Sequence, residues 1–119
     1  MNVVMISTDR NLFKPESNVS ERFREYGTLF DQLEVFVLNV GQEEAYMLRE
    51  NVRIVPINAK NKLQYFFTHV QTQLNTIDVV STQDAFLTAI IGKRLARKHK
   101  ARLHIQIHTD LFAQAYASF

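Results

Sequence analysis

Cysteine is absent from this 119-residue sequence, and glycine and proline are scarce, with three and two residues respectively. Without cysteine the chain can form neither a disulfide scaffold nor a thiol nucleophile. It has no hydrophobic run of the ~20 residues that a membrane-spanning helix needs, and its first residues lack the features of a signal peptide. The 46% of hydrophobic residues and 22% of charged residues exclude a disordered chain. We therefore expect one domain over residues 1–119 in a soluble, cytoplasmic protein.

The scarcity of glycine excludes the common nucleotide-binding motifs. A dinucleotide-binding domain needs a glycine-rich turn after its first strand, whereas the glycines here stand at positions 27, 41 and 92. The sequence also has no P-loop and no Gly-x-Ser-x-Gly nucleophile elbow. A phospho-receiver domain needs paired carboxylates after its first strand to hold Mg²⁺, and Asp9 stands alone there. We expect this chain to bind no cofactor.

Short apolar runs alternate with segments of helical periodicity along the chain. Strands are predicted at 3–6, 35–38, 52–57, 77–80 and 103–107. Helices are predicted at 19–33, 63–74 and 86–95, and residues 41–51 are predicted as a polar connection. This alternation is typical of an α/β fold. We predict an open, mostly parallel, five-stranded Rossmann-like sheet with strand order 3-2-1-4-5 and helices on both faces.

Three local signals refine these elements. Asn18 and Glu21 have the spacing of a capping box at the start of the first helix. Gly27 lies inside that helix, where glycine costs about 1 kcal/mol relative to alanine, so it indicates close packing against a neighbouring backbone. Pro56 indicates that the third strand lies at an edge of the sheet or ends there.

The charges are unevenly distributed along the chain. Residues 1–50 hold nine acidic and five basic side chains, and residues 51–119 hold three acidic and nine basic ones. Six of the 14 basic residues fall between Lys93 and Arg102. We favour a solvated helix end, whose cations complement the helix dipole, over peripheral contact with an anionic membrane surface. No aromatic residue interleaves with these bases, so we expect no nucleic-acid partner.

The carboxyl ends of the predicted strands carry polar residues, and ligands of such sheets bind at that edge. These residues are Ser7, Thr8, Asp9, Arg10, Asn39, the run 81–84 and the run 108–110. His108 is interpreted either as a strand-end imidazole bonded to a loop carbonyl or as a group directed at a ligand. Asp84 either caps the third helix or contacts a ligand, and the two roles are compatible. His104 and His108 lie about 13 Å apart on one strand, so they share no metal ion.

Four segments resemble the N-terminal domain of retaining GT-B glycosyltransferases of family 4. They are Met5-Ile6-Ser7-Thr8-Asp9-Arg10, Glu25-Tyr26-Gly27, Thr82-Gln83-Asp84-Ala85-Phe86-Leu87-Thr88 and Gln106-Ile107-His108-Thr109-Asp110. The resemblance covers nearly the whole chain, and the last two segments are its specific part. It implies an enzyme of two domains that transfers a sugar from a nucleotide-sugar donor to an acceptor sugar, lipid or small molecule.

The resemblance also assigns roles to individual residues. His108 matches the strand-end histidine that lies near the transferred sugar, and Asp84 matches the aspartate of the family's Gln-Asp-Pro-Phe segment. Asp9 and Arg10 fall in the loop that borders the acceptor site, and Asp110 follows His108. The candidate acceptor-side residues are therefore Asp9, Arg10, Asp84, His108 and Asp110. The nucleotide-sugar donor is bound mainly by the other domain of such enzymes.

The sequence departs from the family at three points. Ala85 replaces the usual proline, and Ala113-Gln114-Ala115-Tyr116 stands where a Ser-Pro-Tyr-Phe-like run is common. The chain also stops shortly after its fifth predicted strand. The leading hypothesis is therefore a fragment of a glycosyltransferase that is catalytically incomplete by itself. The alternative is a stand-alone or engineered minimal α/β domain that binds or self-associates, with a homodimer formed through the exposed edge of the sheet.

Overall fold

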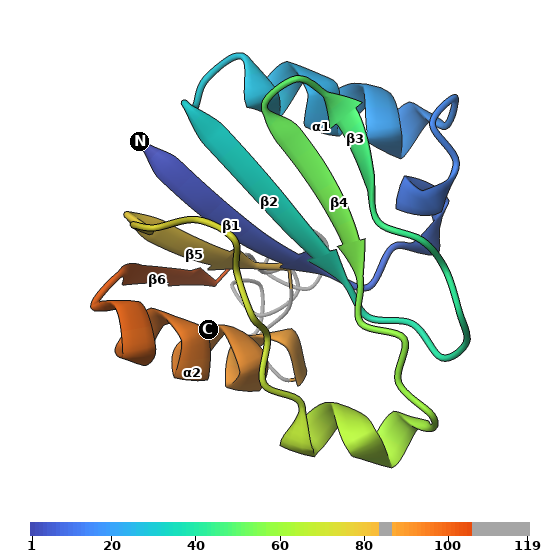
Figure 1. Cartoon of the computed structure of the whole chain (residues 1–119), viewed down its shortest axis with the longest axis vertical. Coiled ribbons are helices and arrows are strands. Elements are labelled where there is room, and N and C mark those ends of the chain that lie inside the picture. Colours follow the sequence, from blue (N-terminus) through green and yellow to red (C-terminus); the bar gives the residue numbers. More distant parts are fainter. Residues whose placement is uncertain (84–86, 106–119) are drawn as a thin grey trace, which may run out of the picture.

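The structure is a computed structural model, and it describes residues 1–83 and 87–105 (Figure 1). Its elements are β1 (Asn2–Ser7), the 3-10 helix η1 (Arg10–Phe13), α1 (Asn18–Gly27), β2 (Gln32–Val37), β3 (Tyr46–Arg49), β4 (Val52–Pro56), the 3-10 helix η2 (Lys62–Phe67), β5 (Val79–Thr82), α2 (Leu87–His99) and β6 (Arg102–Ile105). No helix among the described residues is both long enough and apolar enough to cross a membrane.

The six strands form one sheet with the order β3-β4-β2-β1-β5-β6. All neighbours are parallel except β3 and β4, which are antiparallel. The α/β class and the mostly parallel sheet are thus confirmed. The prediction of five strands in the order 3-2-1-4-5 is wrong because β3 adds an antiparallel edge strand. The other five strands keep that relative order, as β4-β2-β1-β5-β6.

Strand β3 was missed because its sequence signal is short. Tyr46 and Leu48 pack into the core between the sheet and α1 while Met47 is exposed, but this alternation spans only four residues. The register of β3 against β4 shifts between Met47 and Arg49, where the antiparallel pairing is irregular. Residues 41–51 are therefore not only a polar connection. Pro56 is the last residue of β4, so its interpretation as a strand end is confirmed.

Helices α1 and α2 lie on opposite faces of the sheet (Figure 1), and a hydrophobic core lies on each face. Along β1, Val3 and Met5 pack on the side of α1, whereas Val4 and Ile6 pack on the side of α2. The core on the α1 side contains Leu12, Val19, Phe23, Leu33, Val35, Val37, Leu48, Val52 and Ile54 as well. The opposite core contains Phe36, Leu38, Tyr65, Val70, Val80, Ile91 and Leu95. Strand β1 is covered on both faces, and this explains why its sequence is a continuous apolar run and not an alternating one.

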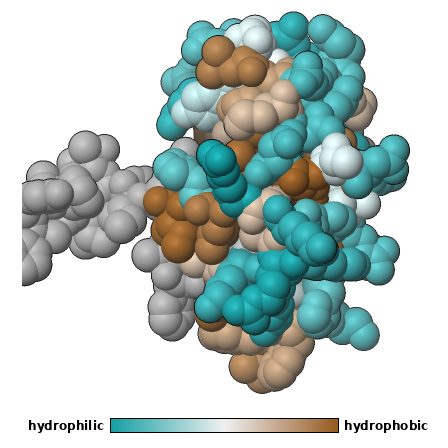
Figure 2. All heavy atoms as spheres, turned by 90° about the vertical axis from the view of Figure 1, so that its left-hand side faces the viewer, coloured by the Kyte–Doolittle hydropathy of each residue, from teal (hydrophilic) through white to brown (hydrophobic). Residues whose placement is uncertain are grey.

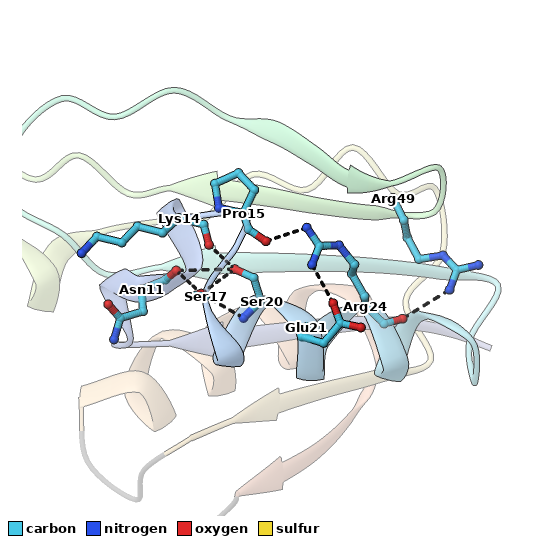
Figure 3. Close-up of polar contacts among 8 residues, drawn as sticks. All are labelled: Asn11, Lys14, Pro15, Ser17, Ser20, Glu21, Arg24 and Arg49. Carbon is cyan, nitrogen blue, oxygen red and sulfur yellow. Dashed lines mark hydrogen bonds and ion pairs between the residues drawn. The ribbon is translucent and has the colours of Figure 1, made fainter.

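Helix α1 begins at a cap one residue earlier than the sequence indicated. The hydroxyl of Ser17, not the side chain of Asn18, accepts the hydrogen bond from the backbone N–H of Ser20, at 3.2 Å. Figure 3 shows how Ser17 and Ser20 also donate to the backbone oxygens of Asn11 and Lys14, at 2.7 and 2.8 Å. These bonds attach the loop after η1 to the first turn of α1.

Helix α1 ends at Gly27, so the predicted continuation to residue 33 is wrong. The amide of Asn51 donates to the carbonyl oxygens of Gly27 and Phe30, at 2.7 and 2.9 Å. A Cβ atom at Gly27 would overlap the side chain of Val52 on β4. The predicted close packing at Gly27 is therefore confirmed, although the neighbour is a side chain and not a backbone. Leu33 belongs to β2.

The predicted helix at 63–74 is largely absent. Only η2 forms, and residues 68–78 connect it to β5 without regular structure. A 3-10 helix has three residues per turn instead of 3.6. Apolar residues that would share one face of an α-helix are therefore divided between two faces of a 3-10 helix. Tyr65 is consequently buried, whereas Leu63 and Phe67 are 66% and 72% exposed.

Candidate functional site

The carboxyl edge of the parallel strands is tied together by side chains from β1 and β5. The hydroxyl of Ser7, the last residue of β1, donates to the side-chain oxygen of Gln83, which directly follows β5. The same hydroxyl accepts a hydrogen bond from the backbone N–H of Asp9, at 3.0 Å. The loop after β1 therefore begins from a fixed position beside the end of β5.

Asp9 acts as the N-cap of η1. Its carboxylate accepts a hydrogen bond from the backbone N–H of Asn11, at 3.0 Å. An N-cap of this kind satisfies a backbone donor that would otherwise have no partner inside the helix. Asp9 is not among the residues that line the two clefts described next.

Arg10 lies on the wall between two neighbouring clefts at this edge. The larger one, which we call the Arg10–Tyr65 cleft, has a volume of about 370 Å³. It is lined by Thr8, Arg10, Leu38, Lys62, Tyr65, Phe66 and Leu87. The smaller one has a volume of about 290 Å³ and is lined by Arg10, Phe13, Lys14, Asn39, Val40 and Glu43. Arg10 is the side chain that both clefts share.

The Arg10–Tyr65 cleft combines residues from four parts of the chain. Thr8 and Arg10 follow β1, Leu38 follows β2, and Leu87 begins α2. The 3-10 helix η2 supplies Lys62, Tyr65 and Phe66. The cleft thus opens at the carboxyl ends of β1 and β2 and includes Leu87 from the segment after β5, beside the point between β1 and β5 where the strand order reverses. Ligands of open α/β sheets bind at this position.

Tyr65 is the buried aromatic group of the cleft. Burial raises the pKa of its hydroxyl above the ordinary value, and the positive charge of Arg10 acts in the opposite direction with a smaller effect. The phenol therefore stays protonated at neutral pH and can donate or accept a hydrogen bond in the cleft.

Asn39, which follows β2, holds a loop rather than facing the larger cleft. Its amide donates to Asn58 at 2.8 Å, and its side-chain oxygen accepts from the backbone N–H of Asn58 at 2.8 Å. Asn58 in turn bonds both backbone groups of Glu43, at 2.9 Å each. With a φ of 54°, Asn58 occupies the left-handed region that asparagine tolerates better than most residues.

Three of the five predicted site residues, Asp84, His108 and Asp110, lie outside the described residues, as do Ala85 and Gln114. Arg10 lines both clefts, whereas Asp9 is engaged in the cap. His104, on β6, has its Nδ1 3.3 Å from the hydroxyl of Ser81 on β5. Within residues 1–83 and 87–105, no three His, Cys, Asp or Glu side chains come together as a metal site.

The contribution of η2 to the cleft does not follow from the sequence pattern. That pattern predicts a core-facing helix at 63–74, which leaves Tyr65 and Phe66 unrecognised as lining residues. The run Thr68-His69-Val70-Gln71-Thr72 could have shown that the helix stops early, because two threonines and a valine are poor helix formers. Lys62 could have been noticed as a cation that precedes exposed aromatic residues.

The basic cluster is mostly a solvated helix face. Lys93, Arg94, Arg97 and Lys98 are exposed on α2, and the last turn carries Arg97, Lys98 and His99. Positive charges at this end complement the partial negative charge of the helix C-terminus. This arrangement agrees with the favoured interpretation of the cluster.

Comparisons of the chain with protein-family models, curated proteins and solved structures found no match.

Proposed function

We propose that this chain forms the acceptor-side part of a retaining glycosyltransferase, and that the Arg10–Tyr65 cleft holds the acceptor. The observation that carries the proposal is the position of that cleft at the carboxyl edge of β1 and β2. The resemblance of residues 5–10 to the acceptor-bordering loop of family 4 enzymes supports the same assignment, since Thr8 and Arg10 line the cleft. The donor sugar would be presented by a second domain.

The described residues of the cleft are suited to positioning. The side chain of Arg10 and the hydroxyls of Thr8 and Tyr65 can orient an acceptor by hydrogen bonds. In the transfer itself, the oxygen of an acceptor hydroxyl forms a bond to the anomeric carbon while the bond from that carbon to the diphosphate breaks. The nucleoside diphosphate leaves with the electron pair of the broken bond and takes up the proton of the acceptor hydroxyl. Holding the two reactants in near-attack geometry supplies much of the acceleration of such a step. His108, Asp84 and Asp110 remain proposed contributors to this site.

The test uses the complete reading frame that contains this chain. The purified product is incubated with UDP- and GDP-sugars and an acceptor mixture, and mass spectrometry measures acceptor-dependent release of the nucleoside diphosphate. We expect release by the complete product and none by residues 1–119. Arg10→Ala should raise the KM for the acceptor and leave the KM for the donor unchanged, while Arg22→Ala on the exposed side of α1 should change neither. Turnover by residues 1–119, or no transfer by the complete product, overturns the proposal.

A second candidate function is self-association through β6. This strand lies at one end of the described sheet, and Leu103 and Ile105 on it are exposed. An exposed edge strand offers unpaired backbone groups to another copy of the chain. Light scattering at micromolar concentration should then give the mass of a dimer, and Leu103→Lys with Ile105→Lys should restore the monomer. A monomeric mass for the unmodified chain contradicts this candidate.

A further inference from the structure

The Arg10–Tyr65 cleft is lined by both apolar and cationic side chains. Leu38, Phe66 and Leu87 supply apolar surface, together with the ring of Tyr65. Arg10 and Lys62 are the charged residues of the lining, and no described lining residue is acidic. In a volume of about 370 Å³, a ligand that reaches both cations also contacts the hydrocarbon surface.

The two cations are available to an anion. Among the described residues, ion pairs join Met1 to Asp31, Arg24 to Glu21, Arg49 to Glu50 and Arg53 to Glu34, so Arg10 and Lys62 take part in none. The neighbouring carboxylate of Asp9 already accepts a hydrogen bond as the cap of η1. The phenol of Tyr65 is uncharged at neutral pH, since its ordinary pKa of about 10 is raised further by burial, so it does not repel an anion.

Apolar surface continues from the cleft onto the outside of η2. Leu63 and Phe67 belong to the same 3-10 helix as the lining residues Lys62, Tyr65 and Phe66, and they are 66% and 72% exposed. Figure 2 shows brown and tan spheres at the lower end of the molecule, where Figure 1 places this helix. A hydrocarbon chain that leaves the cleft along η2 would therefore remain in contact with apolar side chains.

The described part of the lining offers a neutral sugar few hydrogen-bonding side chains. Recognition of sugar hydroxyls needs several hydrogen-bonding side chains, such as carboxylates, which accept hydrogen bonds, and amides, which donate and accept them. The described lining of this cleft contains neither, and its hydroxyl groups are those of Thr8 and Tyr65. Its composition instead matches a ligand with a negative head and a hydrophobic tail.

We propose that the Arg10–Tyr65 cleft binds an anionic amphiphile, with its phosphate or carboxylate head at Arg10 and Lys62 and its hydrocarbon chain along Phe66 and η2. This inference names the class of acceptor that the proposed transferase would use, and to that extent it rests on the proposed function. The binding itself is measured without any sugar transfer.

The experiment is calorimetric titration of residues 1–119 with butyl, octyl and dodecyl phosphate below their micelle-forming concentrations. Inorganic phosphate tests the head alone, and dodecyl maltoside tests a neutral head on the same tail. Affinity should rise by about three- to four-fold for each methylene group that the cleft buries. We expect inorganic phosphate and dodecyl maltoside to bind at least ten-fold more weakly than dodecyl phosphate. Equal binding of the maltoside, no dependence on chain length, or no binding of dodecyl phosphate overturns the proposal.

Two variants assign the site and one serves as a matched control. Arg10→Ala should weaken dodecyl phosphate binding by about ten-fold, because a charge-assisted hydrogen bond is lost. Phe66→Ala should reduce the gain in affinity with alkyl chain length. The difference in affinity between dodecyl phosphate and dodecyl maltoside should remain. Arg22→Ala removes an exposed arginine on the opposite side of the sheet and should have no effect. An equal loss of affinity in Arg10→Ala and Arg22→Ala would show that the anion is attracted nonspecifically by positive charge, and would overturn the assignment of the site.

Vesicles distinguish the two sources of such a ligand. Flotation with phosphatidylcholine vesicles that contain a long-chain lipid phosphate reports whether the chain takes the amphiphile from a bilayer, and titration reports the free amphiphile. Binding from either source supports the proposal. If the complete enzyme transfers sugar only to a soluble neutral acceptor, and dodecyl phosphate does not bind, this inference fails while the proposed function stands. If dodecyl phosphate binds but the complete product transfers no sugar, the proposed function fails.

Discussion

Glu34 on β2 and Arg53 on β4 are partners in the parallel register, and the Nη1 of Arg53 lies 3.3 Å from the Oε2 of Glu34. The side chain of Glu34 is 2% exposed and that of Arg53 is 27% exposed. The second carboxylate oxygen of Glu34 is buried and has no hydrogen-bond partner among the described residues. The Oε2 atom also accepts from the backbone N–H of Gln73, at 3.4 Å. This carboxylate therefore links the sheet to the irregular segment before β5.

Arg53→Met should destabilise the protein strongly because it leaves the buried charge of Glu34 without its counterion. Removal of one partner of a buried pair costs about 3–5 kcal/mol, and the partial exposure of Arg53 places this case at the lower end. The double variant with Glu34→Leu should recover most of the loss, since apolar replacement of both partners is close to neutral. Urea denaturation followed by circular dichroism measures both. A double variant no more stable than Arg53→Met contradicts this account.

Gly27→Ala should destabilise the fold although alanine is the better helix former. The new methyl group would overlap the side chain of Val52, and overpacking costs about 1–3 kcal/mol, against a gain of about 1 kcal/mol in helix propensity. In a Val52→Ala background the space is free, so Gly27→Ala should become neutral or stabilising there. Chemical denaturation of the four proteins in this cycle provides the measurement. The same loss in both backgrounds would argue against the contact.

Asn58 combines hydrogen bonds with a left-handed backbone, and two substitutions separate these contributions. Asn58→Ala and Asn58→Gly both remove the side-chain bonds to Asn39 and Glu43. Only alanine meets steric resistance at a φ of 54°, so the glycine variant should be the more stable by about 1 kcal/mol. In both variants the amide of Glu43 should exchange faster with solvent. Equal stability of the two variants would show that the backbone conformation relaxes.

The hydroxyl of Tyr46 on β3 donates to the backbone oxygen of Leu12, and burial raises its pKa above the ordinary value. The raised pKa means that the folded protein holds the proton more tightly than the unfolded chain. This contribution to stability is complete below the unfolded pKa of about 10 and decreases as the pH rises above it. Tyr46→Phe should be less stable at neutral pH by about 1 kcal/mol, through loss of the hydrogen bond.

The stability of Tyr46→Phe should also decrease less steeply above about pH 10 than that of the unmodified protein. Tyr65→Phe serves as a comparison, because burial raises the pKa of Tyr65 as well and its removal should flatten the same pH range. Thermal unfolding at a series of alkaline pH values measures the slopes. Parallel slopes for Tyr46→Phe and the unmodified protein would contradict the assignment.

Two substitutions separate the role of Asp9 as a helix cap from the role of its negative charge. Asn caps helices about as well as Asp, so Asp9→Asn should keep the stability, whereas Asp9→Ala should lose about 1 kcal/mol. If capping is the whole role of Asp9, Asp9→Asn should also keep the acceptor KM of the complete enzyme. A raised acceptor KM in Asp9→Asn, at unchanged stability, would place the carboxylate in the acceptor site.

The sequence was sufficient for the central strands and insufficient at the periphery. The apolar runs of β1 and β2 are buried on both faces, and β4 buries Val52 and Ile54 on one face, so these patterns are simple and the strands were found. Strand β3 lies at the edge and buries few residues, so its periodicity was too short to recognise. At 63–74 the helical periodicity was present, yet only η2 formed, because the threonines and the valine of 68–72 are poor helix formers.

The amino-acid sequence by itself determined the α/β class, the relative order of five strands and the gathering of polar residues at the carboxyl edge. These follow from local periodicity and from the handedness of crossover connections, which are properties of short segments and of chain chirality. Tertiary structure alone decided that Arg10, Lys62 and Tyr65 line the same cleft while Asp9 is used as a cap. This cleft brings together residues more than 50 positions apart, and it depends on how η2 packs once its predicted α-helix fails to form.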